Sequence, residues 1–210
     1  MTRSAHIDTF ARDNLPPRDA WPELLFELPE LQYPERINCA AELVDGAVER
    51  GWGDRTALLT PAGLRWSYAE LLAEVNRIAH VLVDDMHVVP GNRVLLRGGN
   101  TPAMAACWLA VVKAGGIAVA TMALLRAREL TDVITKAQVS HALCDARLAD
   151  ELDAARRTCP TLRDVVHFAS QADDGLEARA GAKPAAFTRV DTAADDTALI
   201  AFTSGTTGKT

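Results

Sequence analysis

The sequence predicts an α/β fold with a largely parallel sheet flanked by helices. Apolar stretches with strand spacing and with helix spacing alternate between residues 56 and 169, and short connections join them. The apolar fraction, 49% of 210 residues, is enough for a buried core. A Ser/Thr/Gly-rich loop follows the last apolar run, and α/β sheets bind their ligands outside the carboxyl ends of their strands.

Composition divides the chain into four parts. Five prolines interrupt residues 1–50, which we expect to form an N-terminal extension with one helix at 38–50. Residues 51–169 are expected to form the α/β subdomain. Residues 170–197 are polar and weakly patterned, and predict a surface connection to residues 198–210, a final buried strand with a truncated phosphate-binding loop.

The spacing of apolar residues predicts the individual elements. Strands are expected at 56–60, 64–66, 94–96, 116–121, 142–144 and 165–168, and helices at 68–83, 102–114, 128–138 and 148–157. Ser67 and Glu70 form a capping-box pattern at the start of the first of these helices. In the earlier helix at 38–50, Leu43, Ala47 and Val48 are expected on one face.

Charge and cysteine usage argue against several classes of protein. The net charge is −6 with no cluster of Lys or Arg, so nucleic acid is not the expected partner. The four cysteines are widely spaced, which is typical of reduced thiols in a cytoplasmic protein, and no residue is assigned to a metal. Charged residues near the N-terminus predict that there is no signal peptide.

One apolar run has the length of a membrane span. Residues 102–125 are nearly all apolar and could cross a bilayer. Lys113 and the pair Gly115-Gly116 lie in the middle of this run. We therefore expect a buried helix followed by a strand, and no membrane association.

The chain ends in a loop suited to binding phosphate. Small residues and hydroxyl groups from Thr203 to Thr210 let backbone N–H groups come close to an anion. The P-loop NTPase pattern G-x-x-x-x-G-K-[ST] fits Gly208-Lys209-Thr210, but Thr203 stands where its first Gly belongs. The NTPase alternative therefore requires a degenerate first position.

Residues 203–208 read T-S-G-T-T-G, which resembles the phosphate-binding loop of the adenylate-forming enzymes: acyl-CoA synthetases, luciferases and peptide-synthetase adenylation domains. Residues 66–71 (W-S-Y-A-E-L) and 109–116 (L-A-V-V-K-A-G-G) resemble two earlier motifs of the family, in family order. The resemblance covers residues 38–210. It implies the fold of the N-terminal portion of the large domain of an adenylate-forming enzyme.

Three stretches resemble the aromatic-acid branch of this family, the benzoate-CoA and 2-aminobenzoate-CoA ligases. They are residues 31–38 (L-Q-Y-P-E-R-I-N), 89–98 (V-P-G-N-R-V-L-L-R-G) and 124–130 (L-L-R-A-R-E-L). Many acyl-CoA ligases share the second stretch, so the first and third carry the likeness. The resemblance implies an aromatic carboxylic acid as substrate and a role in aromatic compound degradation.

In this family a carboxylate attacks the α-phosphate of ATP to give an acyl-adenylate and pyrophosphate, and the thiol of CoA then displaces AMP. The resemblance implies ATP, Mg²⁺ and CoA as cofactors of the complete enzyme. It assigns phosphate binding to the loop, where hydroxyl groups face the β- and γ-phosphates and glycines allow close backbone approach. The assigned residues are Thr203, Ser204, Gly205, Thr206, Thr207, Gly208 and Lys209.

The loop departs from the family pattern after Gly208. The family continues x-P-K-G, so Lys209 falls at the variable position and Thr210 stands where Pro is usual. The later family motifs, including the metal-binding Glu and the catalytic Lys of the C-terminal domain, have no counterpart here, so no catalytic residue is assigned. We expect the chain to be the N-terminal part of a ligase and to catalyse no CoA ligation alone. A P-loop NTPase and a non-catalytic remnant are the alternatives.

Overall fold

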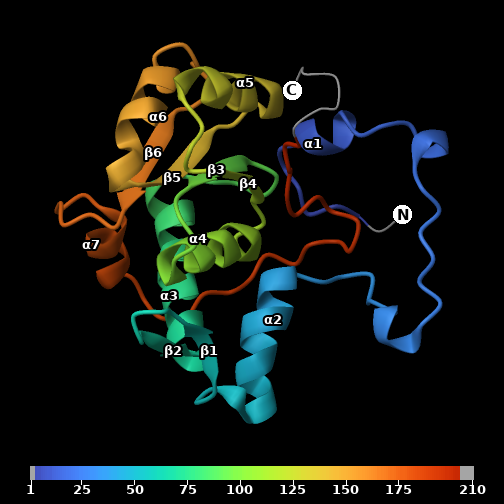
Figure 1. Ribbon diagram of the computed structural model, residues 1–210. Helices are drawn as coiled ribbons and strands as arrows, with labels where there is room; N and C mark the ends of the chain where they lie inside the picture. The colour runs from blue at the N-terminus through green and yellow to red at the C-terminus, as the bar shows by residue number, and fades with distance from the viewer. Residues whose placement is uncertain (1–2, 204–210) are drawn as a thin grey trace.

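A four-stranded parallel sheet lies at the centre of the molecule, for which a computed structural model describes residues 3–203 (Figure 1). The strand order across the sheet is β4-β3-β5-β6. The strands are β3 (Arg93–Arg97), β4 (Ile117–Thr121), β5 (His141–Asp145) and β6 (Asp164–Phe168). A helix joins each strand to the next, so the predicted α/β fold with a largely parallel sheet is confirmed.

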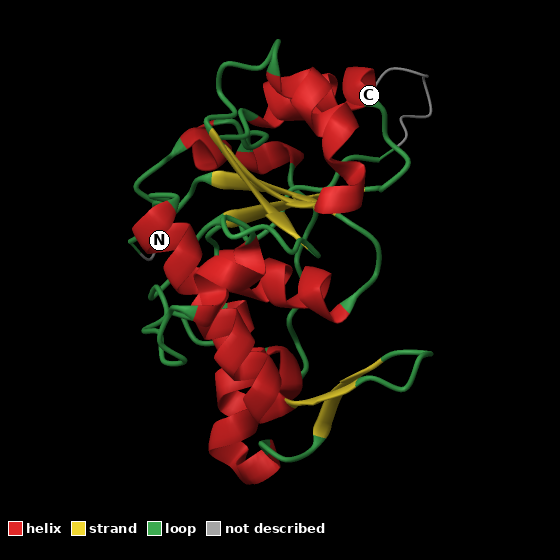
Figure 2. Ribbon diagram, turned by 90° about the vertical axis from the view of Figure 1, so that its left-hand side faces the viewer, coloured by secondary structure: helices red, strands yellow, loops and turns green. Residues whose placement is uncertain are grey.

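Helices cover both faces of this sheet (Figure 2). The crossover helices are α4 (Pro102–Lys113), α5 (Ala127–Ala137) and α6 (Ala149–Arg156), and α3 (Tyr68–His80) packs against α4. An antiparallel hairpin of β1 (Thr56–Leu59) and β2 (Arg65–Ser67) precedes α3. The remaining α-helices of the described residues are α1 (Phe10–Asp13), α2 (Cys39–Ala47) and α7 (Leu176–Gly181).

Alternate residues of β3 serve the two faces of the sheet. Val94 and Leu96 belong to a core cluster with Val111 of α4, whereas Leu95 belongs to a second cluster with Ile134 of α5. β4 and β5 flank β3 on opposite sides, so right-handed crossovers place α4 and α5 on opposite faces. Each of these side chains is fully buried and contributes about 1.5–3 kcal/mol to stability.

The capping box predicted at the start of α3 is present. The Glu70 amide donates to Ser67 Oγ at 3.2 Å, and the Ser67 amide donates to Glu70 Oε2 at 2.8 Å. Two backbone donors that the helix itself leaves unpaired are thereby satisfied. The helix therefore begins at Tyr68, and the predicted apolar face directs Val75 and Ile78 into the core.

Helix α2 packs on α4 through small side chains, which differs from the predicted face. Ala40 and Val44 are buried, whereas Leu43 is 57% exposed. The predicted face was wrong at Leu43 because α2 meets its neighbours on only one narrow stripe, and Leu43 lies on the other side. The α-helical turn also ends at Ala47, earlier than predicted, and continues as a wider helical turn from Val48 to Trp52.

A buried cation joins three helices below the sheet. Lys113 at the end of α4 is fully buried, and its Nζ donates to both carboxylate oxygens of Asp45 on α2 at 2.7 and 2.8 Å. It also donates to Oδ1 of Asn76 on α3 at 2.6 Å. All three donors of the ammonium group are thus satisfied, which is the condition for burying a charge at tolerable cost.

The first 50 residues are not uniform. Residues 14–35 form a loop that extends away from the sheet and its helices (Figure 1). In contrast, α2 lies within the expected extension and still contributes Ala40 and Val44 to the main core. Residues 4–13 lie against the amino end of β3, where Asp8 pairs with Arg93.

The segment 170–197 is more ordered than its composition predicts. It contains helix α7, whose Leu176 and Ala180 are buried in the core cluster with α3 and α4. Farther along, the Val190 amide donates to the Lys113 carbonyl at 3.0 Å. Leu176 and Ala180, spaced four residues apart, are enough to pack this short helix against the core. A helix of this length is too short to show a repeating apolar pattern in the sequence.

Gly115 provides a test of the turn that ends α4. Its φ of +75° is left-handed, and an added Cβ would lie 2.9 Å from Val190 Cγ1. Gly63 has a similar φ of +86° but open space around it. We expect Gly63→Ala to cost about 1 kcal/mol through the backbone alone, and Gly115→Ala to cost about 1–3 kcal/mol more because of overpacking. Urea unfolding of both variants measures the difference, and equal losses would contradict the proposed contact.

Candidate functional site

The last described segment of the chain runs alongside β4. The Ala118 amide donates to the Ala198 carbonyl at 3.0 Å, and the Ile200 amide donates to the Ala118 carbonyl at 2.9 Å. These bonds form a parallel bridge between Ala118 and Leu199. Residues 198–203, which we call the edge segment, therefore travel in the same direction as β4 and lead toward the carboxyl end of the sheet.

The edge segment is less buried than predicted. The sequence predicts a buried strand from Ala198 to Phe202. In the structure Leu199 is 50% exposed, and the other four residues are also partly or largely exposed. The segment forms one bridge and no regular strand within the described residues. Its one bridge is to β4, so the described backbone is paired with a strand on one side alone.

Thr203 is the first residue assigned to the phosphate loop. It is exposed and is the last residue of the edge segment, beside the end of β4. The other assigned residues lie outside the described part of the chain: Ser204, Gly205, Thr206, Thr207, Gly208 and Lys209. Their roles therefore stay predictions, while the point from which the loop departs is known.

A buried arginine lies at the point of strand-order reversal, where such sheets usually bind ligands. The chain reverses its direction of winding between β3 and β5, and Arg97 lies at the carboxyl end of β3, 1% exposed. Its guanidinium donates to four carbonyl oxygens at 2.9–3.3 Å: those of Leu148, Met122, Ala123 and Leu125. These bonds hold the loop between β4 and α5 and the turn at Leu148 against the carboxyl end of β3.

A cavity of about 330 Å³ lies beside Thr203, between the end of β4 and α5. Apolar side chains such as Leu125 and Phe202 form much of its wall, and Glu129, Asp132 and Lys136 of α5 also line it. The Lys136 ammonium lies 6.0 Å from the centre of the Phe202 ring. The cavity therefore has an apolar wall, an acidic part and one cationic group next to the start of the loop.

Neither the buried thiol nor the buried carboxylate at this end of the sheet is poised for chemistry. Burial raises the pKa of the Cys144 thiol to about 12, so the thiolate form is scarce at neutral pH. Asp145 follows it, and hydrogen bonds from the Arg147 side chain lower the pKa of this carboxyl. The Asp145 carboxylate forms an ion pair with Arg147.

The described residues 3–203 offer no group of three or more His, Cys, Asp or Glu side chains that could hold a metal ion. The Mg²⁺ that the resemblance implies is therefore not assigned to any of them. Within the same residues no helix is both long and apolar enough to cross a membrane, and the run at 102–125 is divided into α4 and β4 as predicted.

Comparison with known proteins identifies the family. The model of the AMP-binding enzyme family matches residues 46–210. The chain belongs to this family. Membership decides against the P-loop NTPase alternative, and it agrees with the absence of the first P-loop glycine at Thr203.

The similar curated proteins are CoA ligases that act on different acids. A crotonobetaine/carnitine–CoA ligase of Salmonella typhimurium is 34% identical over 171 residues, which cover 75% of this chain and 32% of that protein. A benzoate–CoA ligase of Thauera aromatica is 27% identical over 183 residues, covering 86% of this chain and 34% of that protein. The chain thus spans about a third of the length of the curated relatives that it matches.

Solved structures share the fold. ATP-bound MatB from Rhodopseudomonas palustris superimposes with a TM-score of 0.72 at 31% identity, covering 82% of this chain and 33% of MatB. The anthranilate CoA ligase AuaEII, in complex with anthranoyl-AMP, gives a TM-score of 0.76 over 84% of this chain and 33% of its own. Its identity is 19%, so this second match concerns the fold alone. The predicted fold of an adenylate-forming enzyme is confirmed.

Sequence patterns did not point to Arg97 or Lys136. Arg97 ends an apolar strand and precedes Gly98-Gly99, so a charged residue at the carboxyl end of a buried strand was the available signal. Lys136 lies on the polar face of an amphipathic helix, where lysines are common and carry no signal.

Arg97 gives a second test. Arg97→Lys keeps the positive charge but replaces the planar guanidinium, which has five N–H donors, with an ammonium group that has three. Carbonyl groups of the β4–α5 loop therefore lose their hydrogen-bond donors. We expect a loss of roughly 2 kcal/mol in the free energy of unfolding. The matched control is Arg147→Lys, an exposed arginine paired with Asp145, which should cost under about 1 kcal/mol. Similar losses in the two variants would contradict the role given to Arg97.

Proposed function

We propose that this chain is the ATP-phosphate-binding part of an ATP-dependent CoA ligase that activates an aromatic carboxylic acid. The observation that carries the proposal is the course of the edge segment. In a member of the AMP-binding enzyme family, it leads to Thr203, the first residue of the T-S-G-T-T-G sequence, at the carboxyl end of the sheet beside β4. Ligands of open α/β sheets bind at this end.

In the proposed reaction, the carboxylate oxygen of the acid attacks the α-phosphorus of ATP. The bond from that phosphorus to the bridging oxygen breaks, and pyrophosphate leaves with the developing negative charge. Hydroxyl groups of Ser204, Thr206 and Thr207 would hold the β- and γ-phosphates, and their preorganised dipoles would stabilise that charge. Gly205 and Gly208 would let backbone N–H groups approach the same oxygens.

The second half of the reaction would use residues outside this chain. The sulfur of CoA attacks the acyl carbon of the adenylate, AMP leaves, and a thioester forms. Lys209 is the cation that the loop itself could offer, at a position where the family pattern is variable. Mg²⁺ would be held by ligands outside residues 3–203, which offer no group of three or more metal-binding side chains.

The aromatic class is the finer part of the proposal. It is supported by the benzoate–CoA ligase of Thauera aromatica, which matches 86% of this chain, and by the stretches at 31–38 and 124–130. A second candidate is a betaine acid, because the carnitine ligase relative has the higher identity, 34% against 27%. The cysteines, none paired in a disulfide, support a cytoplasmic location.

Substrate class is tested by ATP–pyrophosphate exchange with the complete protein that contains this chain. We expect exchange with benzoate or 2-aminobenzoate, and little with crotonobetaine, carnitine or medium-chain fatty acids. Faster exchange with a betaine acid would favour the second candidate. Residues 1–210 alone should give no exchange, and exchange by this piece would contradict the expectation that catalytic residues lie elsewhere.

The loop assignment is tested in the same assay with the complete protein. Thr206→Ala removes one hydroxyl donor to the leaving phosphates and should lower the rate of exchange by about 10²-fold. Thr206→Ser keeps the hydroxyl and serves as the matched control, so it should retain most of the rate. If both variants behave alike, the hydroxyl is not the functional group.

A further inference from the structure

Residues 4–15, which we call the N-terminal strap, lie outside the residues that match the family model. That match begins at residue 46. Side-chain ties at two places fix the strap to the rest of the chain, one at the amino end of β3 and one just before the edge segment. Near the first of these, the Ile7 and Asp8 amides also donate to the Pro90 carbonyl at 2.9 and 3.0 Å. Helix α1, at Phe10–Asp13, belongs to the strap and leads into the exposed loop of residues 14–35 (Figure 1).

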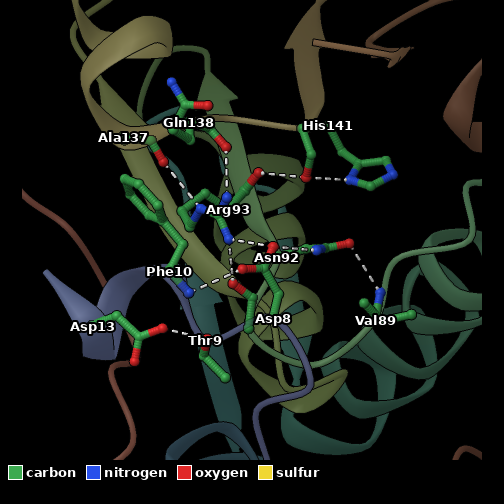
Figure 3. Close-up of polar contacts among 12 residues, drawn as sticks. Asp8, Thr9, Phe10, Asp13, Val89, Asn92, Arg93, Ala137, Gln138 and His141 are labelled. Atoms are coloured by element: carbon green, nitrogen blue, oxygen red, sulfur yellow. Dashed lines mark hydrogen bonds and ion pairs between the residues drawn. The ribbon is translucent and has the colours of Figure 1, made fainter. Parts of the chain in front are cut away.

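The first tie is an ion pair between Asp8 and Arg93, drawn in Figure 3. Asn92 Nδ2 also donates to Asp8 Oδ2 at 2.9 Å, and the Phe10 amide donates to Asp8 Oδ1 at 3.1 Å. The Arg93 guanidinium lies 4.8 Å from the centre of the Phe10 ring. The Asp8 carboxylate and the Phe10 ring of the strap thus both contact the buried guanidinium of Arg93.

Arg93 connects the strap to α5 as well as to β3. Its Nε donates to the Ala137 carbonyl at 3.0 Å, and its Nη2 donates to the Gln138 carbonyl at 2.8 Å. These two residues end α5, the helix that carries Lys136. Because Arg93 is 4% exposed, loss of Asp8 would leave a buried positive charge without its carboxylate.

The second tie joins the strap to the start of the edge segment. Ser4 Oγ donates to Asp196 Oδ1, and the Ala5 amide donates to Asp196 Oδ2 at 3.0 Å. The same carboxylate accepts the Ala193 amide at 2.9 Å, which fixes the turn before Ala198. The strap therefore bridges β3 and the backbone that leads into the edge segment.

Side chains of the strap also face the edge segment. Phe10, Ala11, Asn14 and Leu15 line one wall of a groove of about 570 Å³, and the edge segment lines the other. The lining residues of the edge segment are Ile200, Ala201, Phe202 and Thr203, and Thr197, Lys136 and Ala137 line the groove as well. The strap thus borders the edge segment on the side that β4 does not cover.

We propose that the N-terminal strap is a positioning element for the phosphate-binding loop. By tying β3 and the turn at Asp196 together, it fixes the line along which the edge segment leaves the sheet. Asp8 and Asp196 are positioning residues in this account, because Asp8 acts through Arg93 and Asp196 acts through the turn at Ala193. The proposal rests on the proposed function for its kinetic consequence, but not for its structural one.

The charges of the strap predict how its docking depends on pH. Burial alone would raise the pKa values of Asp8 and Asp196, but hydrogen bonds outweigh it, from Arg93 for Asp8 and from Ser4 for Asp196, and both values are lowered. Both aspartate ties are then complete when the pH is above 3.8, the ordinary pKa of an aspartate. They are lost as the pH falls through the lowered pKa values of Asp8 and Asp196.

His6 acts in the same direction. Burial lowers its pKa below the ordinary value of 6.5, with Asp196 and Asp8 opposing the shift and Arg12 and Arg93 adding to it. A released strap therefore takes up a proton on His6 more readily than a docked one, so docking weakens as the pH falls below 6.5.

The test compares two Asp→Asn variants of the complete protein. Asp8→Asn removes the tie to Arg93, whereas Asp13→Asn alters an exposed aspartate of the same strap, whose carboxylate makes polar contacts with Thr9 and Arg12. We expect Asp8→Asn to speed hydrogen exchange in the peptide covering 198–203 by about tenfold, and to raise KM for ATP by about tenfold with kcat little changed. Asp13→Asn should leave both at the wild-type values.

Ser4→Ala is the second variant, because it loosens the Asp196 tie and leaves buried Arg93 with its partners. It should show the same two effects at smaller size even if Asp8→Asn folds poorly. Unchanged hydrogen exchange at 198–203, or an unchanged KM for ATP in an active enzyme, would overturn the strap's role. A wild-type protein without any carboxylate-dependent exchange would instead refute the proposed function, and hydrogen exchange would still decide whether the strap holds the edge segment.

Discussion

The two hydrogen bonds that Ala118 makes with the backbone of Ala198 and Ile200 fix the place of the candidate site. They set the direction and the register of the edge segment against β4. A shift by one residue would turn each side chain of the segment to the opposite face and move Thr203 along the sheet. The position of Thr203 therefore depends on a short pairing at a sheet edge, which needs support from outside the sheet.

Buried cations supply much of that support. Arg97 holds the loop between β4 and α5 at the carboxyl end of β3, and Arg93 joins the opposite end of the same strand to α5 and the strap. Lys113 joins α4 to α2 and α3. Each of these cations donates hydrogen bonds to carbonyl or carboxylate oxygens, which offset the free-energy cost of burying its charge. The same hydrogen bonds fix the positions of the surrounding loops and helices.

The order of the elements followed from the sequence because their signals are local. Apolar periodicity and the Ser67 capping box are properties of neighbouring residues, and they identified the strands and the crossover helices. The fold class followed from the alternation of these elements. The T-S-G-T-T-G stretch likewise pointed to the family, and the family match over residues 46–210 agrees.

The features that sequence did not predict depend on tertiary neighbours. The exposure of Leu43 and Leu199 depends on which sides of α2 and of the edge segment have a partner. The roles of Arg93 and Arg97 depend on carbonyl groups far away in the chain, such as those of Gln138 and Leu148. Residue type and spacing do not encode such contacts, so only the outline of the site could be predicted.

The central claim is that the T-S-G-T-T-G stretch binds the polyphosphate of ATP at the carboxyl end of this sheet. An ATP analogue with a photoreactive group on the γ-phosphate tests it most directly in the complete protein, with mass spectrometry of the cross-linked peptides. The account predicts that the label attaches to the peptide containing residues 203–210 and that excess ATP prevents it. Labelling confined to other peptides, with none on this one, would contradict the account.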